Sequence, residues 1–289
     1  MKRGMKMYKQ VFITALVLLC VWAVLLTAKT HKEYELDTSR LNEASGLVRS
    51  IRNPGILYSH NDSGGENAIF AIDETGKLKC RIVIAGIKNR DWEEIAIAVD
   101  PQSANPQIYI GEIGDNAAKH PSIAIYKVTE PSLAMGDTLI VIDTYETINI
   151  QYEDGPRDAE AFFVDPQSRD IYIISKREEQ VGIYHLAYPQ SFHQMNTAQK
   201  LGQMQMSWVT AADISPNGKY ILVKNYTGIR RFTVKRKTGI AHALQKKGKS
   251  MPYKLEPQGE AVCWDTRGKG YFSLSEAAEK VPQILYYYR

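Results

Sequence analysis

The chain has few of the residues that build disulfide frameworks and zinc sites. Its 289 residues include 3 cysteines and 6 histidines. Cys20 lies in an apolar N-terminal run, and Cys80 and Cys263 are too few for a disulfide framework or a metal signature. These two thiols can pair in an oxidising compartment, although two isolated buried thiols are the simpler expectation. No histidine recurs at a fixed period along the chain, which argues against zinc.

Several enzyme motifs are also missing from the sequence. There is no Gly-x-Ser-x-Gly nucleophile motif, no catalytic cysteine setting and no glycine-rich phosphate loop. Hydrophobic residues make up 44% of the chain and charged residues 24%, which excludes general disorder and a polytopic membrane protein. The length allows one large domain or two small ones.

Acidic residues are absent from the first 29 residues, although the whole chain has 32. Five cations lie in this segment: Lys2, Arg3, Lys6, Lys9 and Lys29. The remaining residues carry 31 basic and 32 acidic groups, so the formal net charge of +4 comes from this segment. The basic balance of the whole chain therefore does not indicate nucleic-acid binding.

Residues 11–28 (VFITALVLLCVWAVLLTA) contain no charged residue. A helix of this length spans roughly 27 Å, which is enough for the hydrocarbon core of a bilayer. Because four cations precede the run, the positive-inside tendency keeps the N-terminus in the cytoplasm. We therefore expect residues 1–29 to be a single-pass signal-anchor in the cell membrane and residues 30–289 to be one extracytoplasmic domain. The alternative is a cleaved signal peptide, which would leave a secreted or periplasmic domain.

Short β-branched and aromatic runs recur from residue 41 onward and predict an all-β fold. Examples are QIYIG (107–111), DIYII (170–174), KYILV (219–223) and KGYFSL (269–274). The repeating units start near Glu43, Asp91, Asp158, Thr210 and Gly259, at spacings of 48, 67, 52 and 49 residues. Units of four antiparallel strands at such a period are typical of a β-propeller, and their number predicts five blades.

The two ends of the repeat region predict how the ring closes. Residues 259–289 have room for three strands, so the segment Glu33–Asp37 is expected to supply the fourth and to cover the open edge. Thr138–Tyr152 fills the longest spacing and predicts additional strand. A six-bladed ring is the alternative, if residues 130–157 form a blade of their own.

Acidic residues recur where the inner strand of each unit begins. The segments are NEAS (42–45), DWEE (91–94), DAEA (158–161), TAAD (210–213) and GEAV (259–262). Counting back from the turn after each inner strand matches Glu160 with Glu260. The same count matches Glu94 only if its strand has a bulge or a one-residue shift. The loops after the second strands face the same side and carry further polar residues, among them Asp62, Asp115, Lys176-Arg177 and Ser275-Glu276.

These residues predict an acidic mouth at one end of the central channel. The predicted metal ligands are Glu43, Asp62, Asp91, Glu93, Asp115, Asp158 and Glu160. Carboxylates cannot crowd together without compensation, and hard oxygen donors suit Ca²⁺, which takes 6–8 oxygen ligands. As an alternative without metal, the acids cap backbone N–H groups of the next blade or pair with Arg90, Arg157 or Arg177.

A resemblance rests on the combination of seven segments. They are EASGL, HNDSGG, NRDWEEIA, GEIGDN, RDAEA, TAADISPNG and QGEAV. Together they resemble an uncharacterised family of exported bacterial β-propeller proteins over most of residues 41–289. The Asp158-Ala-Glu160-Ala segment is also similar to the acidic inner-strand motif of calcium-dependent phytase-like and esterase-like propellers, which generally have six blades. The resemblance implies calcium at the channel mouth and leaves the substrate open.

Two functions from different classes fit this mouth. In a calcium-assisted phosphoester or ester hydrolase, Glu160, Glu93 and Asp158 would hold the ion. Glu94 or Glu260 would be the base, and Arg177 or Lys176 would bind the anion. The alternative is a non-catalytic propeller that binds a protein or glycan partner, because propellers host many unrelated functions.

A second segment without acids extends from Ile214 to Leu255 and carries eleven cations. Its single-signed field can attract an anionic small molecule, a glycan or a membrane surface. The alternative is a solvated outer edge strand that lysines protect from pairing. Nucleic acid is not expected outside the cytoplasm, and the chain is expected to be monomeric.

Overall fold

Short strands form nearly all of the regular structure, which confirms the all-β prediction. The structure is a computed structural model that describes residues 31–37 and 39–289. The predicted signal-anchor at residues 1–29 lies outside these ranges. Within them, no helix has the length and apolar character needed to cross a membrane. The described part of the chain has one helix, α2 (Gly239–Leu244), which the sequence pattern does not predict.

The strands belong to four sheets. The first contains β2 (Ala44–Arg49), β3 (Ile56–Asn61), β4 (Ala68–Asp73), β5 (Leu78–Ile84) and β9 (Leu139–Ile142). The second has eight strands: β6 (Trp92–Val99), β7 (Pro106–Glu112), β8 (Ile123–Thr129), β10 (Glu146–Tyr152), β11 (Ala159–Val164), β12 (Ile171–Ser175), β13 (Val181–Leu186) and β14 (Asn196–Met204). The third contains β15 (Val209–Ile214), β16 (Tyr220–Asn225), β17 (Gly228–Thr233) and β18 (Lys249–Ser250). The fourth contains β19 (Gly259–Trp264), β20 (Tyr271–Ser275), β21 (Ile284–Tyr288) and β1 (His31–Glu35).

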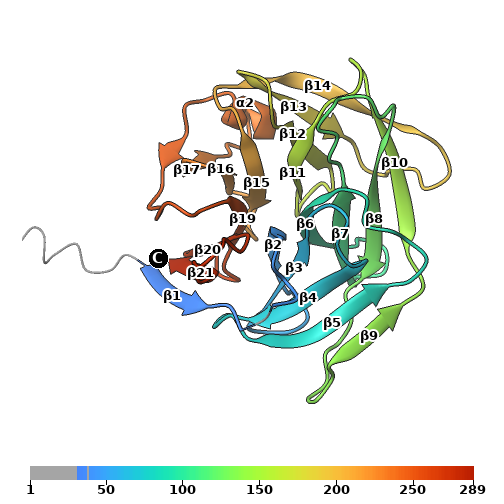
Figure 1. The fold of residues 1–289 in the computed structure, drawn as a ribbon. Coiled ribbons are helices and arrows are strands. Elements are labelled where there is room, and N and C mark those ends of the chain that lie inside the picture. Colours follow the sequence, from blue (N-terminus) through green and yellow to red (C-terminus); the bar gives the residue numbers. More distant parts are fainter. Residues whose placement is uncertain (1–30, 38) are drawn as a thin grey trace, which may run out of the picture. The chain divides into compact units, whose positions relative to one another are not determined.

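Residues Glu33–Arg289 form one compact region. The first strand of each repeat lies at its centre. β2, β6, β11, β15 and β19 pack side by side in this order, and β19 also packs beside β2, so the five inner strands form a closed ring (Figure 1). All six residues of β11 are buried because sheets pack against both of its faces. The result is a propeller-like arrangement in which every inner strand starts at the same end of the ring.

The first and last strands of the described chain meet in the fourth sheet, as the strand count predicts. The sheet order is β1-β21-β20-β19, and the N–H of Leu36 donates to the carbonyl of Gln283 at 2.8 Å. The N-terminal segment thus covers the outer edge that β21 would otherwise expose.

Residues 130–157 do not form a sheet of their own. β9 pairs in parallel with β5, and β10 pairs antiparallel with β8, so this segment adds one strand to each of two existing units. β10 also pairs in parallel with β14, which joins two four-stranded units into the eight-stranded sheet. Thr138–Tyr152 is therefore additional strand, as predicted.

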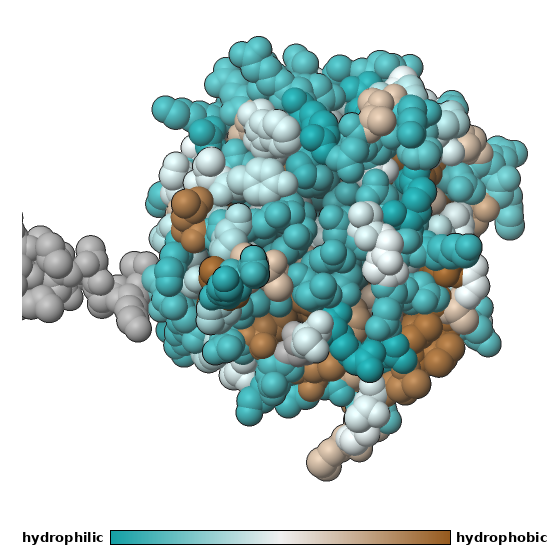
Figure 2. Space-filling view, in the orientation of Figure 1, coloured by the Kyte–Doolittle hydropathy of each residue, from teal (hydrophilic) through white to brown (hydrophobic). Residues whose placement is uncertain are grey.

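Cys80 and Cys263 are both free and buried in separate hydrophobic clusters. The simpler expectation for these thiols is therefore confirmed. In Figure 2 most of the visible face is polar, and apolar residues gather on the side where β5 and β9 lie.

The basic segment covers β16, β17, α2 and β18, and it is only partly a solvated edge. Lys246, Lys247 and Lys249 are exposed beside the two-residue outer strand β18. Lys224 is an exception, because its side chain is fully buried in an ion pair with Glu256. The sequence pattern places Lys224 in the basic surface, and that prediction is wrong for this residue.

Candidate functional site

Each of the five inner strands has a β-bulge one or two residues after its start. The extra residues, which have no partner on the second strand, are Gly46, Glu93, Glu160, Thr210 and Glu260. A bulge re-aims the side chain of its extra residue. Because the inner strands form a ring, the same irregularity brings these five positions together at one mouth.

Three of the five bulge positions carry glutamates that converge. Oxygens of Glu93, Glu160 and Glu260 lie within 4.8 Å of one another, and all three residues are buried. Thr210 instead donates its hydroxyl to the carbonyl of Gly259 at 2.9 Å. Gly46 has φ = +68°, and an added Cβ would lie 2.8 Å from the backbone nitrogen of Ile95, so only glycine fits there.

Glu94 does not occupy the position equivalent to Glu160 and Glu260. β6 has eight residues against six in β11 and β19, so counting back from the turn selects the wrong glutamate, and the bulge selects Glu93. The Glu94 carboxylate is fully buried and accepts the N–H groups of Ile95 at 3.0 Å and Ala212 at 2.9 Å. Burial raises the pKa of Glu94 well above its ordinary value. This residue links β6 to β15, which are not adjacent in the ring, so it caps a backbone N–H group as in the metal-free alternative, but not one of the next blade.

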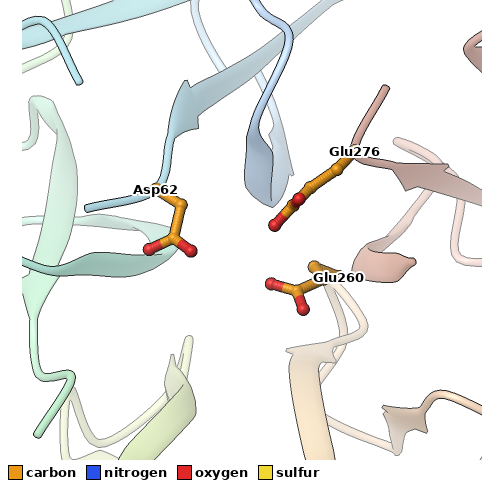
Figure 3. A group of neighbouring side chains, drawn as sticks. All are labelled: Asp62, Glu260 and Glu276. Carbon is orange, nitrogen blue, oxygen red and sulfur yellow. The ribbon is translucent and has the colours of Figure 1, made fainter. Parts of the chain in front are cut away.

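A second layer of side chains follows the ends of the second strands. Asp62, Lys176, Tyr226 and Glu276 come directly after β3, β12, β16 and β20. Asp62, Glu260 and Glu276 point toward one another from three different strand ends, with carboxylate oxygens within 4.8 Å (Figure 3). Asp62, Asp91 and Glu93 form another such group. Six carboxylates thus surround the mouth: Asp62, Asp91, Glu93, Glu160, Glu260 and Glu276.

The crowding of these carboxylates changes their protonation. Burial, together with the charges of Glu260 and Asp91, raises the pKa of Asp62 to about 6. Burial, followed by the charges of Glu260, Asp62 and Glu43, raises the pKa of Glu276 to about 8. Burial also raises the pKa of Asp91 and, more strongly, that of Glu93. Burial and mutual repulsion therefore favour the protonated forms of these carboxyls, whereas a bound cation would favour the charged forms.

Two oxygens at the centre of the cluster have no hydrogen-bond partner among the described residues. They are Oε2 of Glu93 and Oε2 of Glu160, both buried. An unpaired buried carboxylate oxygen is costly, so native structures seldom leave one without a role. Gly114 lies directly against this site, because an added Cβ would meet Oδ2 of Asp91 and Oε1 of Glu93, each at 2.4 Å.

The mouth also contains one buried cation. Lys176 pairs with Oε1 of Glu160, and its ammonium lies over the ring of Tyr226, 5.3 Å from the centroid. The Tyr226 hydroxyl donates to Oε1 of Glu260 at 2.8 Å. Lys176 therefore compensates one of the six carboxylates, and the hydroxyl of Tyr226 partners another.

Arg177 and Asp158 form a separate ion pair beside the cluster. The Nε of Arg177 donates to Oδ2 of Asp158 at 2.5 Å, and its Nη2 donates to Oδ1 of Asn116. Asp158 also accepts the N–H of Asp115 at 2.9 Å. The guanidinium lies over the ring of Trp208, 5.4 Å from its centroid.

Five of the predicted acids lie in the carboxylate groups, and the others lie outside these groups. Asp62, Asp91, Glu93, Glu160 and Glu260 are in the groups. Glu43 precedes β2 and is exposed. Asp158 pairs with Arg177, and Asp115 accepts the N–H of His120 at 2.7 Å while its buried Oδ1 has no partner among the described residues.

The sequence places Glu276 on the face of the mouth but not among the predicted ligands, and it does not point to Tyr226 or Trp208. Glu276 could have been counted as a ligand, because it follows its second strand at the same offset as Asp62 follows β3. Tyr226 and Trp208 occupy corresponding positions in the fourth unit, where the motif has no acid. An alignment on the acidic motif alone therefore misses them.

Comparisons with known proteins leave the family open. No protein-family model matches the sequence, and no curated protein matches it. Among solved structures, the fold is similar to an auxiliary nutrient binding protein from Bacteroides thetaiotaomicron VPI-5482, with a TM-score of 0.48 and 14% sequence identity. The similarity covers 88% of this chain and 64% of that chain, so this chain spans less than two thirds of its length.

Proposed function

We propose that this protein is a non-catalytic binding propeller whose acidic mouth holds a Ca²⁺ ion. The observation that carries the proposal is the pair of buried, unpartnered oxygens on Glu93 and Glu160. A bound cation would give both oxygens a partner and would compensate the excess negative charge. The ligands proposed for it are Glu93, Glu160, Glu260, Asp62 and Asp91, with Glu276 added from the geometry.

The donor set supports calcium over zinc. Every member of the three carboxylate groups offers oxygen, and none offers imidazole or thiolate. Ca²⁺ accepts 6–8 oxygen ligands in flexible arrangements, whereas zinc prefers four ligands that include nitrogen or sulfur. The resemblance of the Asp158–Ala161 segment to calcium-dependent propellers agrees with this choice.

The proposed setting is a monomeric five-bladed propeller on an N-terminal membrane anchor, with the mouth outside the cytoplasm. The ring of five inner strands supports the number of blades. The uncharged run at residues 11–28 and the cations before it support the anchor. The proposed partner of the mouth is an anionic small molecule or glycan that reaches it from the extracytoplasmic side.

Two of the residues predicted for hydrolysis are already engaged in contacts within the protein, which favours binding over hydrolysis. Glu94 is sealed below the surface by two backbone N–H groups, and Lys176 is held by Glu160. Neither is free to act as the base or to hold a transferred anion. Calcium-dependent hydrolysis stays the second candidate, because a pKa of about 8 would let Glu276 exchange a proton near neutral pH.

The cation site is tested by adding Ca²⁺ to the full chain in detergent after treatment with EDTA. At a free calcium concentration of 100 times Kd, we expect stabilisation by about 2.7 kcal/mol, or roughly 5 to 10 °C in Tm. The variant Glu93→Gln should lose this shift. Glu66→Gln, which alters an exposed carboxylate in a surface ion pair, should keep it.

The absence of any calcium-dependent shift in the wild-type chain would overturn the metal proposal. A panel of phosphoesters and carboxyesters, assayed with the same preparation, separates the two functions. Calcium binding without turnover supports the binding propeller. Turnover that Glu276→Gln abolishes would replace the binding proposal with the hydrolase.

A further inference from the structure

Trp208 holds an unusual place at the rim of the mouth. It lies two residues before the bulge residue of β15, and the corresponding positions before the bulges of β6, β11 and β19 are Asp91, Asp158 and Gln258. Its side chain is 48% exposed. The other two tryptophans of the described chain, Trp92 and Trp264, are buried.

The backbone at Trp208 lies in the left-handed region, which favours glycine. Its φ is +55°, a conformation that bulky residues rarely adopt and that costs free energy unless the surroundings hold it. Its N–H donates to the carbonyl of Lys176 at 2.7 Å, which fixes the residue to the strand end that carries the mouth cation. An exposed aromatic held in a strained conformation beside a polar mouth is a candidate recognition residue.

Arg177 completes the surface around Trp208. Its guanidinium stacks over the indole, and its Nε and Nη2 are held by Asp158 and Asn116. Within the described residues no acceptor is assigned to its Nη1, and the side chain is 38% exposed. A guanidinium oriented in this way offers a fixed N–H edge to an anion, and its geometry matches a carboxylate or a phosphate.

The charges around the pair restrict the ligand. Arg177 directly follows Lys176, which pairs with Glu160 of the carboxylate groups, so an anion can approach Arg177 at low cost only when a cation compensates these acids. A singly charged carboxylate is repelled less than a phosphate, which carries more charge. The carboxylates and the hydroxyl of Tyr226 can bond with hydroxyl groups, whereas an apolar aromatic acid would leave such groups unpaired.

We infer that Trp208 and Arg177 form a recognition subsite for a carboxylated sugar ring at the rim of the proposed cation site. The C–H face of the ring would pack on the exposed indole, and its carboxylate would meet Arg177 and the cation. This inference rests on the proposed function and adds the ligand class. Binding of the sugar and of Ca²⁺ should therefore be reciprocal, each raising the affinity for the other.

The test measures binding of trigalacturonate to the full chain in detergent, with and without Ca²⁺, by calorimetry and tryptophan fluorescence. Galactotriose, which lacks the carboxylates, and inorganic phosphate are the comparison probes. We expect calcium-dependent binding of trigalacturonate with a change in emission, and no comparable binding of either comparison probe.

Two variants separate recognition from folding. Trp208→Gly removes the ring, and glycine tolerates φ = +55°, so the fold and the calcium-dependent Tm shift should be kept. Its affinity for trigalacturonate should fall about tenfold or more, as for an aromatic hot spot. Arg177→Lys keeps the charge but loses the planar fork, and it should also weaken binding.

The outcomes distinguish this inference from the proposed function. Unchanged trigalacturonate binding by Trp208→Gly, equal binding of galactotriose, or binding of phosphate alone would each overturn the subsite. No trigalacturonate binding at any calcium concentration would overturn it as well. If Ca²⁺ gives no Tm shift but binding still depends on Trp208 and Arg177, the cation site fails and the subsite stands.

Discussion

Two clusters of buried charge in this molecule differ in how completely their polar atoms are paired. In the first, Lys224 and Glu256 are fully buried at 2.5 Å, and Lys224 also bonds with Ser273 and with the carbonyls of Ala261 and Leu274. In the second, the carboxylates of the mouth outnumber their cation, and two buried oxygens have no partner among the described residues.

The difference teaches how to separate a structural cluster from a candidate binding site. Both clusters contain buried charged side chains. The Lys224 cluster satisfies its donors and acceptors internally, so a ligand would gain nothing there. The mouth has unmet acceptors and carboxylates whose pKa values burial raises, which is the pattern found at functional sites.

The largest loss of stability is expected when the ion pair between Lys224 and Glu256 is removed. Lys224→Met should destabilise the chain by about 3–5 kcal/mol, because Glu256 would keep a buried charge without its partner. Urea unfolding in EDTA and in Ca²⁺ should give the same loss. The control Lys246→Met, at an exposed position, should change stability by less than about 0.5 kcal/mol. If Lys224→Met were as stable as the wild type, internal pairing would not distinguish the Lys224 cluster from the mouth.

The next effect concerns pH and involves the carboxylates of the mouth together with buried Glu94 and Asp213, whose pKa values burial also raises. Unfolded carboxyl groups titrate near pH 4, while folding raises the pKa of Asp62 to about 6 and that of Glu276 to about 8. Between about pH 4 and pH 8 the folded chain therefore binds more protons than the unfolded chain. Its stability in EDTA should therefore fall as pH rises from about 4 to 8.

Thermal unfolding across this pH range checks the sign of the dependence. Glu276→Gln should flatten the curve between about pH 6 and 8, since its folded-state titration lies there. Saturating Ca²⁺ should reduce the fall, because a cation favours the charged carboxylates. Stability that rises with pH in EDTA would mean that the carboxylates are already compensated within the protein.

The sequence predicts the fold better than it predicts the members of the site. The β-branched runs, the spacing of the units and the missing fourth strand of the last unit predict the inner ring and its closure. Counting from the turn fails at Glu94, because β6 is two residues longer than β11 and β19. Lys224 looks like part of a basic surface, because its partner Glu256 lies outside the strands and 32 residues away. Long-range pairing of this kind leaves no local pattern.

A smaller effect tests the cation that the mouth already contains. Lys176 occupies one oxygen of Glu160, so its ammonium should compete with Ca²⁺ for the cluster. Lys176→Met should bind Ca²⁺ about tenfold more tightly, equivalent to about 1.4 kcal/mol, and should be less stable than wild type in EDTA. Calorimetry measures the affinity. Lys200→Met, whose side chain pairs with Asp154 in another part of the unit, is the matched control. Weaker calcium binding by Lys176→Met would mean that the lysine positions the ligands.

The smallest change in stability is expected from removing one hydroxyl group, that of Tyr226. Tyr226 donates to Glu260 at 2.8 Å and is only partly buried, so Tyr226→Phe should lower stability in EDTA by about 1 kcal/mol. In Ca²⁺ the loss should shrink, because the cation then satisfies the same carboxylate. Chemical unfolding in both conditions gives the difference. A loss of the same size with and without Ca²⁺ would mean that Glu260 does not bind the cation. Glu260 would then be an internally paired acid like Glu256.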